Sequence, residues 1–158
     1  MTLANIVRRK LAEAKPASSR HELLFTDESC PWTVHLTAER RDEWSTVAWE
    51  FSLGRGTPFA GDLAAWAERI AGSASGLMET LKVVEVDRER NEALVRSAEP
   101  ALRDGQLFYY EIVLQGTAGA MLRRYQGAAE VGQKRIQVPF ALTNEALAKL
   151  AGDLASEK

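Results

Sequence analysis

Apolar and polar residues alternate through much of the chain between residues 32 and 140. The strongest strand candidate, QLFYYEIVLQ at 106–115, leads through the turn sequence GTAG into a second candidate at 120–128. Successive side chains of a strand point to opposite faces of a sheet, so this period of two indicates strands with one buried face. Because the candidate strands follow one another through short turns, we expect them to pair in an antiparallel sheet.

The first predicted hairpin covers residues 32–53. Its first strand places on one face Trp32, Val34, Leu36 and Ala38, and its second strand places on one face Val47, Trp49, Phe51 and Leu53. Both apolar faces share a core if residues 40–43 form the loop, a register that pairs Val34 with Trp49. His35 then lies on the outer face near Ala48, or opposite Glu50 if the loop is shorter by two residues. The same alternation predicts that Phe108 and Val138 are buried as well.

Two further hairpins follow from the same pattern. Pairing residue 87 with 92 across the turn DRERN brings Val86 opposite Ala93 and Val84 opposite Val95. Pairing residue 115 with 120 sets Glu111 opposite Arg124 and Tyr110 opposite Tyr125, which are favourable cross-strand pairs. After a turn at residues 131–132 the alternation resumes over 136–140, where Pro139 is typical of an edge strand or of a strand's last residues.

Three segments have the spacing of amphipathic helices. Thr2 can cap the first, which occupies residues 1–15 and could lie at the periphery. The second begins near Asp62, and Thr143 caps the third. We therefore expect one α+β domain over residues 1–158, with a mainly antiparallel twisted sheet of about six to eight strands covered by three helices. Residues 16–31 fit either an edge strand or a helical turn.

The tripeptide PFA occurs twice, at 58–60 and at 139–141, each time between a predicted strand and an alanine-rich helix. The spacing is close to half the chain, which an internal duplication would explain. Little beyond the tripeptide aligns, so coincidence explains it equally well. In either case each proline can end a strand and direct the chain into a helix.

The net charge of −2 is distributed unevenly along the chain. Residues 1–21 hold five basic residues and one acidic residue, a balance of +4, so the remainder carries −6. Such a segment can dock on an acidic partner, nucleic acid or a membrane surface, or it can be a solvated helix face. The predicted core contains most aromatic residues and acids neighbour the bases, so the sequence disfavours nucleic-acid binding.

Several features favour a cytoplasmic protein. No apolar run reaches the roughly 18 residues that a membrane span needs, and charges interrupt the region where a signal peptide would be apolar. Cys30 is the only cysteine, so one chain can form neither an internal disulfide nor a cysteine-based zinc cluster.

The residues for catalysis and metal binding are scarce. Cys30 and His35 would stand about 17 Å apart on an extended chain, too far for a nucleophile and its base. HELLF at 21–25 lacks the second histidine of a zinc-binding helix, and GRGTPFAG at 54–61 lacks the lysine of a phosphate-binding loop. We therefore predict no metal, no cofactor and no catalytic residue.

Two groups of residues are candidates for a ligand or partner surface. Arg123 is predicted to share a face with apolar residues, where a guanidinium must reach water, an acid or a bound anion. With Tyr110 and Tyr125 it could form a pocket for a small anionic ligand, or it could extend outwards from the margin of the sheet.

The second group, His35, Trp44 and Glu50, lies on the outer side of the first hairpin. An exposed tryptophan can anchor a protein interface, although a turn residue can also fold over its neighbours.

These observations favour a non-enzymatic binding or adaptor protein that acts through protein–protein contacts as a homodimer. The alternative is a small-molecule carrier or enzyme with a pocket between sheet and helices near Arg123. The order of helices and strands is similar to that of small acidic secretion chaperones, but the chain has no motif of theirs, so this resemblance concerns the fold alone.

Overall fold

A computed structural model describes residues 2–74, 76–128 and 134–155. The helices are α1 (Leu3–Glu13), α2 (Leu63–Ser73) and α3 (Asn144–Ala155). The strands are β1 (His21–Phe25), β2 (Thr33–Arg41), β3 (Ser45–Gly54), β4 (Leu81–Asp87), β5 (Glu92–Ser97), β6 (Ala101–Arg103), β7 (Gln106–Gln115), β8 (Gly119–Ala128), β9 (Ile136–Val138) and β10 (Phe140–Thr143).

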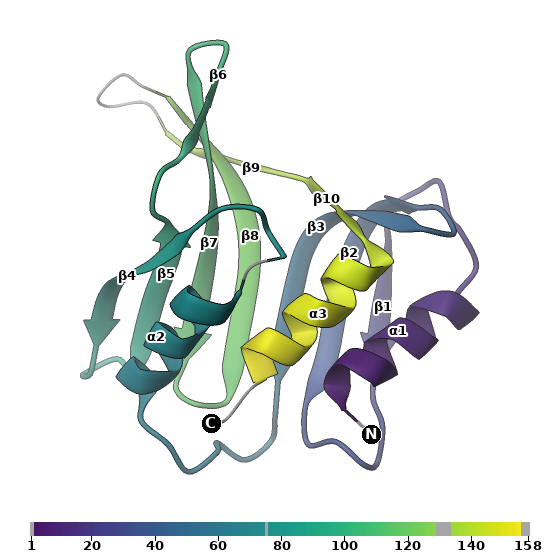
Figure 1. Cartoon of the computed structure of the whole chain (residues 1–158), viewed down its shortest axis with the longest axis horizontal. Helices are drawn as coiled ribbons and strands as arrows, with labels where there is room; N and C mark the ends of the chain where they lie inside the picture. Colours follow the sequence, from purple (N-terminus) through teal and green to yellow (C-terminus); the bar gives the residue numbers. More distant parts are fainter. Residues whose placement is uncertain (1, 75, 129–133, 156–158) are drawn as a thin grey trace.

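All the strands belong to one antiparallel sheet, whose main path runs β1-β2-β3-β8-β7-β5-β4. The three helices lie on the same side of this sheet, with α3 in the middle, α1 beside β1 and α2 in front of β4 and β5 (Figure 1). The chain is therefore a single α+β domain with three helices, as the alternating pattern predicts.

Each helix begins at the side chain that the sequence indicates. The backbone N–H of Asn5 donates to the Thr2 hydroxyl at 3.2 Å, and that of Ala65 donates to the Asp62 carboxylate at 3.1 Å. In α3 the N–H of Ala146 donates to the Thr143 hydroxyl at 3.1 Å. These bonds satisfy N–H groups that have no partner within the first turn of a helix.

Helix α1 is an integral part of the core. Its apolar stripe is buried, and its main neighbour is α3. Two of its arginines form ion pairs, Arg8 with Glu145 of α3 at 2.8 Å and Arg9 with Asp27 at 3.1 Å. The N-terminal positive charges are thus partly matched within the fold.

The β2–β3 hairpin contains two irregularities, and its register differs from the predicted one. Leu36 pairs with Phe51, but Ala38 pairs with Ala48, so Trp49 is an additional residue in β3. A bulge of this kind reverses the phase of alternation beyond it. A second irregularity, at Glu39 of β2, restores the register, and the loop comprises residues 42–45 and not 40–43. Val34 therefore pairs with Leu53 and not with Trp49, and the predicted register is wrong.

The expected burial of three residues is met only in part. Trp49 is half-buried on the side of the sheet away from the helices, and the Arg20 guanidinium lies 4.7 Å from its ring centroid. Phe108 and Val138 are also half-buried. By contrast, the predicted apolar face of β2, from Trp32 to Ala38, is buried as expected.

The β7–β8 hairpin differs from its predicted register by one residue. Gln115 pairs with Gly119, so the loop contains three residues, and Gly116 adopts a φ of 55°. That left-handed backbone conformation is accessible to glycine at little cost. As a result Glu111 pairs with Arg123, and Tyr110 pairs with Arg124.

The outer hairpins agree more closely with expectation. Asp87 pairs with Glu92 and Val86 with Ala93, as predicted, but an irregularity at Val84 then sets Val83 opposite Val95. HELLF, left undecided by the sequence, forms the edge strand β1.

β3 and β8 pair directly only from Phe51–Leu122 to Gly54–Gly119. Beyond that stretch β9 pairs with β8, and β10 pairs with β3 (Figure 1). Pro139, which needs no ladder hydrogen bond, lies where the chain changes partners, so this segment joins two strands and is not an edge. Gln137 Nε2 also donates to the Trp49 carbonyl at 2.9 Å. The predicted turn at residues 131–132 lies outside the described residues.

The core lies between the sheet and the helices. Trp66 of α2 is fully buried and packs edge-on against Phe59, with ring centroids 5.2 Å apart. Its indole N–H donates to the Leu154 carbonyl of α3 at 2.9 Å, which satisfies the one polar group of a buried side chain. Among the described residues no helix is long and apolar enough to cross a membrane.

Candidate functional site

The side of the sheet opposite the helices, here called the open face, carries a row of mostly charged residues that crosses seven strands. We call this the charged row; neighbours along it are Glu22, Thr37, Glu50, Arg123, Glu111, Arg96 and Lys82. Acids predominate on the β1–β3 side and bases on the β8–β4 side. The charged row is therefore more negative at its β1 end and more positive at its β4 end.

Ion pairs hold the centre of the charged row in place. Arg123 Nη2 lies 3.2 Å from Glu50 Oε2, and Arg96 Nη2 lies 3.0 Å from Glu111 Oε2. Arg135, which precedes β9, adds a contact of 2.6 Å from its Nη1 to the same Glu111 oxygen. The Glu111 residue is only 5% exposed, so two guanidinium groups enclose a carboxylate on a face that no helix covers.

Two arginines of this network, Arg123 and Arg135, have a pKa above the ordinary value of arginine. Burial lowers the pKa of Arg135, but its hydrogen bonds to Glu111 and Tyr109 outweigh this effect and raise the pKa above its ordinary value. Burial also lowers the pKa of Arg123, but its hydrogen bond to Tyr125 and its interaction with Glu50 outweigh burial and raise the pKa above its ordinary value. Both cations are therefore fixed features of the open face.

An aromatic pair adjoins these charges. The rings of Tyr109 and Tyr125 stack with centroids 5.9 Å apart. The Arg135 guanidinium lies 3.8 Å from the Tyr125 centroid, and that of Arg96 lies 5.3 Å from the Tyr109 centroid. Cations over ring faces at these distances are attracted by the π-electrons, which limits the motion of all four side chains.

The structure brings together four of the six candidate residues. Arg123, Tyr125, His35 and Glu50 all lie on the open face. His35 pairs across the strands with Ser52, and its Nε2 is 3.9 Å from Glu22, so it lies outside the core as predicted. Trp44 lies apart from them, in the turn at the far end of the β2–β3 hairpin.

Tyr110 faces the helices and belongs to a different cluster, in which Arg124 and not Arg123 is its neighbour. The Arg124 guanidinium lies 4.3 Å from the Tyr110 ring centroid and binds Glu79 at 2.9 Å. Ser97 donates to the other Glu79 oxygen at 2.6 Å. Burial raises the pKa of Tyr110, so its hydroxyl stays protonated.

The sequence did not indicate Glu111, Arg96 and Arg135 as site residues, because their proximity depends on the β5–β7 pairing and on the one-residue shift of β8. The signal that could have found the shift is Gly116. A three-residue hairpin loop requires a residue with positive φ, and glycine supplies it.

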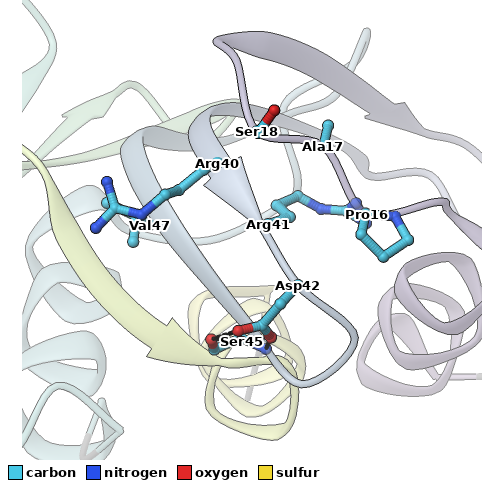
Figure 2. Close-up of a pocket in the computed structure, with 8 residues that line it drawn as sticks. All are labelled: Pro16, Ala17, Ser18, Arg40, Arg41, Asp42, Ser45 and Val47. Carbon is cyan, nitrogen blue, oxygen red and sulfur yellow. Dashed lines mark hydrogen bonds between the residues drawn. The ribbon is translucent and has the colours of Figure 1, made fainter.

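A hollow of about 380 Å³ lies beside the turn of the β2–β3 hairpin (Figure 2). Its lining residues are Pro16, Ala17, Ser18, Arg40, Arg41, Asp42, Ser45 and Val47. Backbone N–H groups of Trp44 and Ser45 donate to Asp42 Oδ1 at 2.8 and 2.7 Å, and these bonds lower the pKa of Asp42. The turn therefore keeps a charged carboxylate at neutral pH.

Arg41 combines deep burial with the absence of a carboxylate partner among the described residues. It is 5% exposed, and Nη1 donates to the Lys15 carbonyl just beyond α1 at 3.1 Å. Burial lowers its pKa. Carbonyl groups near the C-terminal end of a helix carry partial negative charge, so a cation there stabilises the end of α1. A structural role accounts for Arg41.

The described residues contain no group of three or more histidine, cysteine, aspartate or glutamate residues that could hold a metal ion. Cys30 is partly buried against the core. Arg55 of GRGTPFAG lies 5.1 Å from the Trp32 ring centroid, which gives this stretch a packing role.

No model of a protein family matches the chain, and the searches found no similar curated protein and no similar solved structure.

Proposed function

We propose that this chain is a non-enzymatic binding protein that recognises a protein partner through its open face and works as a homodimer. The observation that carries the proposal is the charged row, held by ion pairs on the one face of the sheet that no helix covers. Side chains fixed in this way lose little conformational entropy when a partner binds.

The distribution of charge defines the chemistry of the partner. Glu22 and Glu50 present negative charge on one side, while Lys82 and Arg96 present positive charge on the other. A complementary surface would carry basic groups opposite β1–β3 and acidic groups opposite β5 and β4. Such complementarity guides docking and fixes its orientation more than it raises affinity.

The alternative of a ligand pocket between sheet and helices near Arg123 has no supporting observation. Arg123 lies on the open face in an ion pair with Glu50, and Arg124, which faces the helices, is paired with Glu79.

The test places a photo-crosslinking amino acid at Thr37, in the charged row, and for comparison at Glu68, an exposed residue of α2 on the helix side. Both variants are expressed in the source cells and irradiated. We expect a discrete crosslinked protein from position 37 alone. We also expect it to disappear when Glu22→Lys and Lys82→Glu reverse both ends of the row. The same products from both positions would overturn the proposal.

A further inference from the structure

Trp44 is 78% exposed at the turn of the β2–β3 hairpin, an unusual position for the largest apolar side chain. Scattered exposed apolar residues are normal on protein surfaces and by themselves indicate nothing. Two further features of this turn distinguish Trp44: hydrogen bonds hold its backbone, and Asp42 and Ser45 of the same turn line a hollow.

Hydrogen bonds from both sides fix the turn. Asp42 accepts from the N–H groups of Trp44 and Ser45, as described above. From α3, the Asn144 N–H donates to the Trp44 carbonyl at 2.8 Å, and Asn144 Nδ2 donates to the Glu43 carbonyl at 3.0 Å. The backbone that carries the indole is thus anchored to the start of α3. A partner binding the indole would not have to order this backbone.

Asp42 and Ser45, which flank the tip of the turn, both line the hollow of about 380 Å³ (Figure 2). This volume falls within the ~300–1,000 Å³ of sites that accept small ligands, and the hollow is open to solvent. Pro16, Ala17 and Val47 supply apolar wall. Arg40 also lines the hollow, is exposed, and has no ion pair among the described residues.

We propose that two copies of the chain associate through this turn, with Trp44 of each copy inserted into the hollow of the other. The exposed tryptophan and the hollow belong to the same turn, so each copy can offer the same patch to the other, as a two-fold axis requires. The Arg40 guanidinium supplies a cation for the face of the incoming indole. This inference rests on the self-association in the proposed function and names the contact that produces it.

The expected association is weak. A buried tryptophan contributes roughly 150–250 Å² of contact area, and two of them fall far short of the ~1,200 Å² of a standard stable interface. We therefore expect a dissociation constant in the micromolar range. Such a dimer would leave the charged row uncovered, because the row crosses the middle of the sheet and Trp44 lies at a hairpin tip.

Analytical ultracentrifugation of the purified chain from about 1 µM to about 1 mM tests the contact. We expect the wild-type chain to form dimers over this range. Trp44→Ala should raise the dissociation constant by at least about 30-fold, the loss typical of an interface hot spot. Ala17→Arg should do the same by filling the hollow. The matched control is Leu102→Ala, which removes another exposed apolar side chain near a hairpin tip and should change nothing.

The outcomes separate this inference from the rest of the proposed function. Circular dichroism and thermal melting verify that each variant is folded. If the wild-type chain dimerises and Trp44→Ala dimerises equally well, the proposed Trp44 contact is wrong, but the proposed self-association remains. A wild-type chain that stays monomeric throughout would overturn both, while crosslinking at Thr37 would still report on the partner surface. A chain that dimerises only with added inorganic phosphate would show that the hollow holds an anion and would also overturn the inference.

Discussion

At the scale of single residues, Glu111 is the carboxylate on which the open face depends. Its neighbours Arg96 and Arg135 come from separate parts of the chain, one from β5 and one from the residues before β9. A nearly buried carboxylate is costly unless cations and hydrogen bonds compensate it. The relative positions of β5, β7 and the residues before β9 therefore depend on the negative charge of Glu111.

Removing that charge should destabilise the fold. We expect Glu111→Ala to lower the free energy of unfolding by about 1–3 kcal/mol in urea denaturation. This is less than the ~3–5 kcal/mol found when a fully buried pair is broken, because both arginines reach solvent and can be hydrated. Glu92→Ala, which removes an exposed acid from β5, should stay within about 0.5 kcal/mol. Equal effects of the two substitutions would contradict the importance of the network.

Residue-level prediction failed where it depended on register. The alternation in 106–128 identified both strands correctly, yet the assumed four-residue turn paired Glu111 with Arg124 and assigned Arg123 to the buried face. A shift of one residue exchanges the two faces of a strand, so a single misjudged turn changes every cross-strand neighbour. The prediction that His35 lies on the open face is nevertheless correct. The register error in its hairpin is an even number of residues, and the bulge lies between His35 and the turn.

At the scale of elements, helix periodicity and capping residues were sufficient to predict all three helices. Neither the periodicity nor the capping residues could show that the apolar stripe of α1 is buried in the core. The five basic residues near the N-terminus made a peripheral helix plausible, but the apolar stripe of α1 meets α3, an element more than a hundred residues away. Local patterns do not specify such long-range contacts.

The packing of α1 predicts a strong effect of truncating its stripe. Leu11 is buried, so Leu11→Ala should lower the free energy of unfolding by about 2–5 kcal/mol. Arg8→Ala breaks a solvent-exposed ion pair with Glu145 and an exposed hydrogen bond to Asn5, and should cost less than about 1 kcal/mol. Chemical denaturation of both variants measures the contrast. A small effect for Leu11→Ala would mean that α1 is peripheral after all.

The bulge at Trp49 is a second feature of an element that alternation could not reveal. The pattern Val47, Trp49, Phe51 is continuous, and nothing in it marks the additional residue. Only the pairing of β3 with β10, and the bond from Gln137 to the Trp49 carbonyl, show what accommodates the irregularity.

At the scale of the whole molecule, the sheet consists of two halves that meet at β3 and β8. Both copies of PFA follow the strands at this junction, and Phe59 and Phe140 are both buried. The helix after each copy lies over the opposite half: α2 follows β3 but packs on β4 and β5, and α3 follows β8–β10 but packs on β3 and α1. In both halves, a strand at the junction is followed by PFA and then by a helix that covers the opposite half. This holds whether or not the two halves arose by duplication.

Phe140 should therefore stabilise both halves at once. Its ring packs edge-on against Tyr110 of β7 with centroids 5.6 Å apart, while its backbone pairs with β3. We expect Phe140→Ala to lower the free energy of unfolding by about 3–5 kcal/mol and to speed amide hydrogen exchange in both β3 and β7. Ala141→Ser, at the adjacent exposed position, should do neither. Faster exchange in β3 alone would show that Phe140 serves one half only.

The pairing of β9 and β10 between β8 and β3 also has a consequence for how the polypeptide acquires its structure during synthesis. Residues 136–155 complete the sheet and supply the helix against which α1 packs, so the earlier segments cannot close their core while those residues remain in the ribosome. Contacts between such distant parts of a chain form slowly, because a long loop must close first. We expect the nascent polypeptide to remain dependent on chaperones until α3 has emerged.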